Sequence, residues 1–249
     1  SSVKATELWS IQYLFDAPEL VEAVHTDFFK AGADVATVNS YSIHRERLKK
    51  YNLQDRFKDL HILACELAVN ARDKHGKGSV AGALGPIGWT YRPDLAPKAD
   101  QAAEIFSEIA LIQKPFVDII LCETMSSVEE ARGAVLGASI AGKPVWLSVS
   151  IDDEDGTRLR SGEPVQSVLN LLSDCKIDAL LVNCSFPEAV SQAIPLLALC
   201  PVPVGGYANG FGQIPVEFKQ KGATVDLLQK RTNLTPEVYV KFAGDWISS

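Results

Sequence analysis

Two short segments of the sequence place chemically active side chains directly after an apolar run. In residues 178–187 the apolar run ends at Val182, and Asn183, Cys184 and Ser185 follow it. A short apolar run is typical of a strand that is buried on both faces. Proteins with parallel strands keep their chemistry at the carboxyl ends of those strands. We therefore expect Cys184 to present a thiolate to a pocket, weighed against the more common role of cysteine as a small buried apolar residue.

The second segment places a carboxylate after an apolar run. Glu123 and Thr124 follow the apolar residues 119–122. A carboxylate at such a position either loses its hydration inside the core or faces a polar cavity at the end of the sheet. Carboxylates are rarely buried unless they are paired, so the sequence favours the cavity for Glu123.

Aromatic and amide side chains follow two other apolar runs. Trp89 and Tyr91 lie in the loop of residues 87–97, and two large aromatic side chains in one loop indicate either a pocket wall or a cover for the end of the sheet. Tyr207 and Asn209 end the last apolar run of the chain. These residues are candidates for contact with a ligand.

Residues 152–156 form the acidic loop, which reads Asp-Asp-Glu-Asp-Gly. The cluster suggests calcium, but the alternating ligand spacing and the distal glutamate of an EF-hand loop are missing. We expect a solvated turn here.

Six apolar runs alternate with helical patterns along the chain. The predicted strands are residues 34–41, 79–86, 117–124, 145–151, 178–183 and 202–209, and the predicted helices are residues 17–32, 45–74 with a break near residue 52, 98–114, 126–141, 165–174, 187–199 and 235–249. Such alternation predicts parallel strands joined by crossover helices. No strand is followed by a glycine-rich nucleotide-binding motif, which argues against a doubly wound sheet. We expect an α/β fold, a (β/α)8 TIM barrel formed by residues 1–249 as a single domain, with its first and last strands missing or incomplete.

Composition excludes several classes of partner. The chain has 249 residues, 47% of them hydrophobic, and a net charge of -7. An acidic balance without a basic run argues against nucleic acid and against an anionic membrane surface. No apolar stretch approaches the roughly 20 residues that span a bilayer.

The five cysteines are odd in number and form no C-x-x-C pair, which indicates reduced thiols in a cytoplasmic protein, available for metal binding or burial. No feature of the sequence specifies an oligomeric state.

Seven segments in order resemble the homocysteine S-methyltransferase family. They are Leu8-Trp9-Ser10, Asp16-Ala17-Pro18-Glu19-Leu20, Ala31-Gly32-Ala33-Asp34, Asn39-Ser40-Tyr41, Leu121-Cys122-Glu123-Thr124, Val182-Asn183-Cys184-Ser185 and Gly206-Tyr207-Ala208-Asn209-Gly210. No single segment is decisive, but their order and spacing are fairly specific. The resemblance extends from about residue 8 to residue 246.

The resemblance implies a barrel that holds one Zn²⁺ by three cysteine thiolates at the carboxyl ends of its strands. Cys184 matches the first of these ligands. The other two are adjacent cysteines in a Gly-Gly-Cys-Cys-Gly-Thr motif on the last strand, which the 249 residues do not contain. The first strand of the family, with its Asp-Gly-Gly segment, is likewise absent or compressed. One thiolate does not make a zinc site, so either the protein continues past Ser249 into the cysteine pair or it is a relative that has lost its metal. We expect the first, because a buried sheet without its first and last strands would expose two unpaired edges.

The resemblance also implies a reaction, in which Cys184 and Glu123 are the catalytic residues. Zinc would hold the thiol of L-homocysteine as a thiolate, which would take a methyl group from S-methylmethionine or S-adenosylmethionine and give methionine. Glu123 resembles the residue that binds the ammonium group of homocysteine. Asn183, Asn209, Tyr207 and Trp89 complete the predicted substrate-binding set.

Two alternatives come from other classes. The first is a metal-free barrel that binds an amino acid or a protein partner without turnover. The second is a phosphate-binding aldolase or isomerase, which ranks last because no predicted strand ends in lysine.

Overall fold

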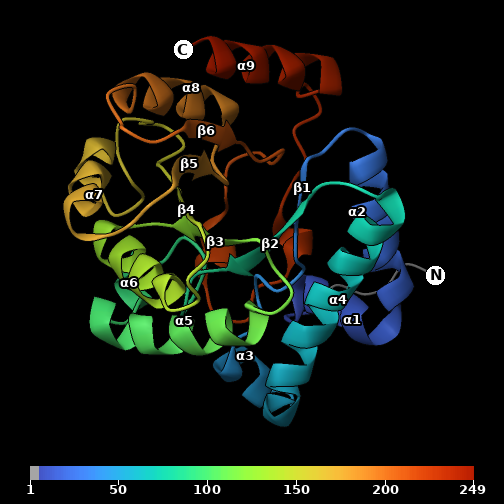
Figure 1. The fold of residues 1–249 in the computed structure, drawn as a ribbon. Helices are drawn as coiled ribbons and strands as arrows, with labels where there is room; N and C mark the ends of the chain where they lie inside the picture. The colour runs from blue at the N-terminus through green and yellow to red at the C-terminus, as the bar shows by residue number, and fades with distance from the viewer. Residues whose placement is uncertain (1–5) are drawn as a thin grey trace.

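A parallel sheet of six strands, which follow one another in the order of the chain, lies at the centre of the molecule (Figure 1). The computed structural model describes residues 6–249. The strands are β1 (Val35–Thr37), β2 (Ser79–Leu84), β3 (Ile119–Met125), β4 (Val145–Val149), β5 (Ala179–Asn183) and β6 (Val204–Tyr207). Because each strand pairs in parallel with the next one along the chain, the sheet has the topology of a barrel wall. Its six strands curl into an open half-barrel.

Helices connect successive strands and cover the outer face of the sheet (Figure 1). The α-helices are α1 (Gln12–Asp16), α2 (Pro18–Lys30), α3 (Arg45–Lys49), α4 (Phe57–His75), α5 (Ala99–Gln113), α6 (Val128–Ser139), α7 (Leu171–Asp174), α8 (Pro187–Leu196) and α9 (Pro236–Ser248). Short 3-10 helices are η1 (Trp9–Ile11), η2 (Gln54–Arg56), η3 (Pro93–Leu95), η4 (Val165–Asn170), η5 (Val216–Lys219) and η6 (Val225–Leu227). Helix α2 packs on α4, and α5 packs on α6. None of the helices in residues 6–249 is both long and apolar enough to cross a bilayer.

The hydrophobic core fills the space between the sheet and its helices. Phe106 of α5, Leu60 of α4, and Ile120 and Leu147 of the sheet have no exposed surface. The opposite, concave face of the sheet carries a smaller apolar set, in which Ala81, Ile119 and Leu121 are buried and Val35, Trp146 and Leu181 are half-buried. The sheet is therefore packed mainly through its outer face.

The amino ends of the strands, which we call the amino edge, are joined by aspartate side chains. The carboxylate of Asp118, just before β3, accepts the backbone N–H of Val80 at 2.9 Å. The carboxylate of Asp178, just before β5, accepts the backbone N–H of Val145 at 2.9 Å. Each bond links the start of one strand to the start of its neighbour, and so helps to fix the register of the sheet.

This register brings the carboxyl ends of the strands together, at what we call the carboxyl edge. Val149 of β4 lies opposite Val182 of β5, and Asn183 of β5 lies opposite Tyr207 of β6. The β3–β4 ladder shifts register between Cys122 and Met125, as at a β-bulge. A bulge re-aims the side chains that it contains, so the end of β3 differs from a regular strand.

Most of the predicted elements are confirmed, although several differ in extent. The predicted strand of residues 34–41 is paired only over Val35–Thr37, because the chain turns at Ser40, whose N–H is donated to the carbonyl of Val38. The predicted helix of residues 165–174 is mostly 3-10 helix. Helix α8 ends at Leu196 rather than at residue 199, next to an internal proline, Pro195. The sequence predicted an eight-stranded barrel whose first and last strands are missing or incomplete. Residues 6–249 form a partial barrel of six parallel strands.

Candidate active site

Cys184 lies at the carboxyl edge, immediately after β5. Its side chain is half-buried, and its backbone N–H is donated to the carbonyl of Tyr207 at 3.2 Å. Burial raises the pKa of the Cys184 thiol to about 11, against the opposing effect of a hydrogen bond with the Thr124 side chain. The predicted position of Cys184 at a strand end is confirmed.

Thr124 is held next to this thiol by Asn183. The Asn183 side-chain oxygen accepts the backbone N–H of Thr124 at 3.0 Å, and its Nδ2 donates to the Thr124 hydroxyl at 2.9 Å. Asn183 has no exposed surface. Predicted as a substrate-binding residue, Asn183 has a geometry that supports a different task, which is to fix Thr124 beside Cys184.

Glu123 and Tyr207 meet across the carboxyl edge. Tyr207 of β6 donates its hydroxyl to Oε2 of Glu123 at 3.2 Å. Burial raises the pKa of Glu123 to about 7, and the hydrogen bond from Tyr207 opposes this shift. Glu123 as a whole residue is nevertheless half-buried. A cationic partner would restore its charged form.

An aromatic cluster packs against Cys184. Its buried members are Trp89, Tyr91, Ile214, Phe218 and Ala223, and Trp9, Leu95, Cys184, Phe211 and Leu228 pack against them. The indole N–H of Trp89 is donated to the carbonyl of Phe218 at 3.0 Å, and that of Trp9 to the carbonyl of Ala223 at 2.9 Å. The rings of Trp89 and Tyr91 join the segment of residues 211–228 beside the thiol, an arrangement that fits both a pocket wall and a cover for the end of the sheet.

Two guanidinium groups cover faces of these rings. Arg47 of α3 lies over the rings of Trp9 and Trp89, at 4.4 and 4.7 Å from the ring centroids. Arg160 lies over the ring of Tyr91 at 4.0 Å. Cation–π attraction of this kind stabilises a desolvated aromatic cluster. No pattern in the sequence indicated either arginine.

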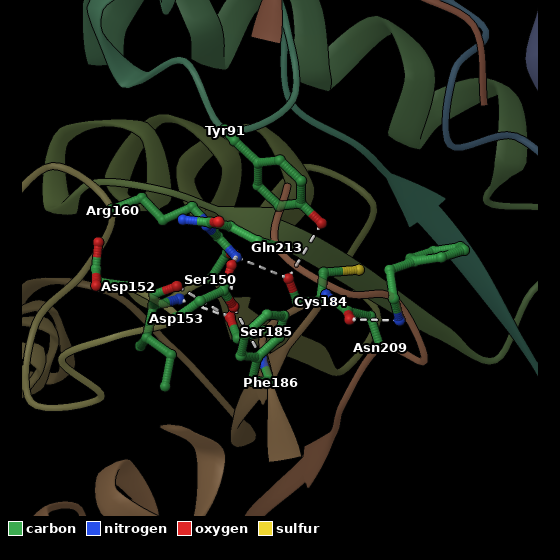
Figure 2. Close-up of polar contacts among 12 residues, drawn as sticks. Tyr91, Ser150, Asp152, Asp153, Arg160, Cys184, Ser185, Phe186, Asn209 and Gln213 are labelled. Carbon is green, nitrogen blue, oxygen red and sulfur yellow. Dashed lines mark hydrogen bonds and ion pairs between the residues drawn. The ribbon is translucent and has the colours of Figure 1, made fainter. Parts of the chain in front are cut away.

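The acidic loop is only partly the solvated turn that the sequence predicted. Asp153 is buried and forms an ion pair of 3.0 Å with Arg160, with side-chain exposures of 10% and 6% (Figure 2). Its other oxygen accepts the backbone N–H of Phe186 at 2.9 Å. The chain folds back after β4, pairing Ile151 with Leu159, and this reversal brings Arg160 to Asp153. The prediction for Asp153 was wrong because a local charge pattern does not reveal such a reversal.

Left-handed backbone conformations concentrate at this site. In residues 6–249 five residues other than glycine have a positive φ, namely Trp9 (52°), Asn52 (55°), Tyr91 (63°), Thr124 (66°) and Cys184 (50°). All except Asn52 belong to the site described above. The left-handed region disfavours L-residues by about 1–2 kcal/mol each, and most strongly those that are β-branched. Backbone strain of this kind clusters at functional sites.

Asn209 follows β6 and lies near Cys184 in Figure 2. Its side-chain oxygen accepts the backbone N–H of Phe211 at 3.0 Å. Its Nδ2 atom is buried and has no hydrogen-bond partner among residues 6–249. A buried donor without a partner is unfavourable by about 1–3 kcal/mol, so this amide is suited to donate to a bound ligand.

The described residues do not complete a zinc site. Cys65, Cys122 and Cys175 are buried, and Cys200 precedes β6 near the amino edge, so Cys184 is the thiol that residues 6–249 place in the site. No three histidine, cysteine, aspartate or glutamate side chains of this region converge on a common position. A catalytic zinc needs three protein ligands, and this part of the chain supplies one sulfur.

Comparisons with known proteins agree on one family. A family model described as homocysteine S-methyltransferase matches residues 1–249. The homocysteine S-methyltransferase YbgG of Bacillus subtilis (strain 168) is 29% identical over 233 residues, which cover 85% of this chain and 73% of YbgG. The homocysteine S-methyltransferase of Escherichia coli (strain K12) is 30% identical over 224 residues, with 82% and 71% covered. The metallated form of the Escherichia coli homocysteine methyltransferase MmuM superposes with a TM-score of 0.75 at 26% identity, covering 84% of this chain and 78% of that chain.

Proposed function

The chain belongs to the homocysteine S-methyltransferase family, and from this we propose that it transfers a methyl group from S-methylmethionine or S-adenosylmethionine to L-homocysteine, giving methionine. In this reaction the homocysteine sulfur releases its proton to water and forms a bond to the methyl carbon. The bond between that carbon and the donor sulfur breaks, and its electron pair stays on the donor, which leaves as a neutral sulfide. The observation that carries the proposal is the convergence of Cys184 with the Glu123–Tyr207 pair at the carboxyl edge.

Glu123 is proposed to bind the ammonium group of homocysteine. Its carboxylate is half-buried next to Cys184, and it accepts one hydrogen bond, from Tyr207. An ammonium group would favour its ionised form and add a charge-assisted hydrogen bond, which is stronger than a neutral one. The unpaired Nδ2 of Asn209 is proposed to donate to the carboxylate at the other end of the amino acid.

The aromatic cluster is proposed to receive the methyl donor. A sulfonium is attracted to aromatic faces by about 1–2 kcal/mol where water is excluded. Because Arg47 already covers Trp89 and Arg160 already covers Tyr91, the donor would contact the remaining ring faces together with Phe211 and Tyr207. The cluster would also exclude water from the reacting sulfur.

The proposal includes a zinc ion that would bind the homocysteine thiol. Cys184 would supply one sulfur ligand, and the other two would come from outside residues 6–249, since these residues contain no further thiol at the carboxyl edge. Zinc content of the purified protein under reducing conditions tests this assignment. In a full-length protein that carries the cysteine pair, we expect the Cys184→Ala variant to lose zinc that the unchanged protein retains. A normal zinc content in that variant would remove Cys184 from the metal site.

The reaction itself is tested by methionine formation from homocysteine with S-methylmethionine, S-adenosylmethionine or betaine as the donor. We expect turnover with at least one sulfonium and none with betaine. Turnover with betaine alone would overturn the choice of donor, and homocysteine binding without turnover of any donor would favour the metal-free binding barrel.

The role of Glu123 is tested separately with Glu123→Gln. We expect the KM for homocysteine to rise by about 10- to 100-fold, the loss of one charged hydrogen bond, while the KM for the donor changes by less than about twofold. Tyr207→Phe is the matched variant, because it keeps the carboxylate and removes only its hydrogen bond, and its effect on the same KM should be smaller. An unchanged homocysteine KM in Glu123→Gln would contradict the assignment.

A further inference from the structure

One ion pair in the described chain differs from all the others in its burial. In Arg160–Asp153 both side chains are almost fully buried, at 6% and 10% exposure, whereas every other ion pair within residues 6–249 has at least one partner that is more than a quarter exposed. Burying two charges removes their hydration, which their mutual attraction repays only where the geometry is good and further hydrogen bonds are made. A buried pair of this kind therefore calls for an explanation.

The hydrogen bonds of Arg160 supply that explanation. Its Nε donates to the Ser150 hydroxyl at 2.7 Å, and its Nη2 donates to Asp153 at 3.0 Å and to the carbonyl of Cys184 at 3.1 Å. Its guanidinium plane also lies over the ring of Tyr91. A planar guanidinium with several fixed donors can satisfy these partners together, which an ammonium group cannot do.

The Cys184 carbonyl accepts a second hydrogen bond, from the Tyr91 hydroxyl at 3.1 Å. Both lone pairs of this oxygen are therefore used by donors that are themselves packed against each other. Figure 2 shows the carbonyl oxygen of Cys184 directed toward Arg160 and Tyr91, and the sulfur on the other side of the residue. Fixing the carbonyl also fixes the left-handed backbone of Cys184, with φ of 50°, and so the direction of its thiol.

We propose that Arg160 is a positioning residue for Cys184. Held by Asp153 and Ser150 and stacked on Tyr91, it keeps the Cys184 backbone in its left-handed conformation, so that the thiol points into the site instead of relaxing to an ordinary strand geometry. The importance of this direction for methyl transfer rests on the proposed function, whereas the positioning itself does not. Arg160 contacts the backbone carbonyl of Cys184, so it acts on the thiol through the backbone.

The test compares Arg160→Lys with Arg158→Lys. Lysine keeps the charge opposite Asp153 but loses the planar fork and the stacking on Tyr91. Arg158 is a matched control, because it is paired with Asp155 of the same acidic loop, is 53% exposed and makes no contact with Cys184. Tyr91→Phe tests the other donor to the Cys184 carbonyl. It removes the Tyr91 hydroxyl and leaves the ring beneath Arg160.

The direct readout is the rate at which iodoacetamide alkylates each cysteine, measured by peptide mass spectrometry. Cys200 is also half-buried and serves as the internal reference in the same molecule. In Arg160→Lys we expect alkylation of Cys184 to accelerate by about threefold or more, because the freed turn exposes the thiol, while the rate at Cys200 stays unchanged. Arg158→Lys should change neither rate, and Tyr91→Phe should accelerate Cys184 alone by a smaller factor.

Two results would overturn the proposal. Equal Cys184 rates in Arg160→Lys, Tyr91→Phe and the unchanged protein would show that the thiol does not depend on these donors. A parallel acceleration at Cys184 and Cys200 would show a general loosening of the fold. Alkylation requires no turnover, so absence of methionine formation in the unchanged protein would reject the proposed function and leave this result standing.

A kinetic split gives the second readout. If methionine is formed, Arg160→Lys should lower kcat by about tenfold through misalignment of the reacting groups, with the KM for homocysteine changed by less than about twofold. A rise in KM with unchanged kcat would contradict a positioning role.

Discussion

The two edges of the sheet solve the same backbone problem with different residues. Where the chain turns between a helix and the next strand at the amino edge, the left-handed positions are glycines, at Gly32, Gly76, Gly78 and Gly142. At the carboxyl edge, the left-handed residues nearest to the ends of β3 and β5 are Thr124 and Cys184, whereas glycines take this conformation farther along the loops after β2 and β4, at Gly88 and Gly162. Glycine adopts this conformation without strain, whereas an L-residue is disfavoured in it by about 1–2 kcal/mol.

Side-chain hydrogen bonds to the backbone differ between the edges in the same way. Asp178 accepts the N–H of Val145 at the amino edge with a carboxylate that is 31% exposed. Asn183 accepts the N–H of Thr124 at the carboxyl edge with no exposed surface. The comparison indicates that the amino edge favours stability. The carboxyl edge retains backbone strain and buried polar groups, which fix the directions of the side chains in the site.

The largest effect should come from replacing Cys184, and two substitutions distinguish the role of its thiol from the strain in its backbone. Cys184→Gly and Cys184→Ala both remove the sulfur, and each should lower methionine formation by about 10³-fold or more, equivalent to about 4 kcal/mol in the barrier. Only glycine also relieves the left-handed strain, so the glycine variant should unfold in urea with a free energy about 1 kcal/mol higher than the alanine variant. Equal stabilities would mean that the carboxyl edge carries no strain at this residue.

The next effect concerns buried hydrogen bonds. Asn183→Leu removes both hydrogen bonds between Asn183 and Thr124 and leaves the buried N–H of Thr124 without its partner, so we expect the free energy of unfolding to fall by about 3 kcal/mol. Asp178→Ala is the matched control at the amino edge, where the N–H of Val145 regains water as a partner and the loss should be about 0.5–1 kcal/mol. Urea unfolding of both variants checks the difference, and equal losses would remove the contrast between the edges.

A buried acid next to the carboxyl edge should give a pH-dependent effect. Burial raises the pKa of Glu130, at the start of α6, from 4.5 to about 7. The folded protein therefore binds more protons than the unfolded chain between these values, and stability falls as the pH rises from about 4.5 to 7 and levels off above. Glu130→Gln removes this titration, so wild type should lose about 2 kcal/mol relative to the variant across that window. Unfolding free energies that differ by a constant amount from pH 4.5 to 8 would contradict the shift.

The sequence predicted those parts of the site that follow directly from a strand. Cys184 and Glu123 each come at the end of an apolar run, and the parallel register then places them at one edge. The order of six strands was predicted for the same reason, since apolar runs alternate with helical patterns. The amide of Asn183 was also found in this way, although its attachment to Thr124 was not, because hydrogen bonds between strands 59 residues apart leave no local pattern.

The parts that the sequence did not reveal depend on contacts between distant segments. Trp9 lies in an N-terminal stretch without periodicity, and it reaches the site through a hydrogen bond to Ala223, 214 positions later. Arg160 reaches Asp153 only because the chain reverses after β4. Local patterns of charge and hydropathy carry no information on either contact. The sequence therefore singled out Trp89 and Tyr91 but gave no reason to expect Trp9 or Arg160 beside them.

The smallest effect tests the amino edge itself, with Gly142→Ala. An added Cβ at Gly142 meets no atom within 4 Å, so its φ of 66° is the only obstacle to a side chain there. The variant should lose about 1 kcal/mol in the free energy of unfolding, with methionine formation unchanged, because the site lies at the other edge. Gly244 of α9 is the matched control, since its added Cβ also meets nothing within 4 Å but its φ is that of a helix. Gly244→Ala should therefore stabilise the protein by up to about 1 kcal/mol. Opposite signs for two glycines with equally open surroundings would show that backbone conformation alone selects glycine at position 142. A neutral Gly142→Ala would show that a left-handed alanine is not disfavoured at this position. The same result would contradict the backbone strain inferred for Thr124 and Cys184.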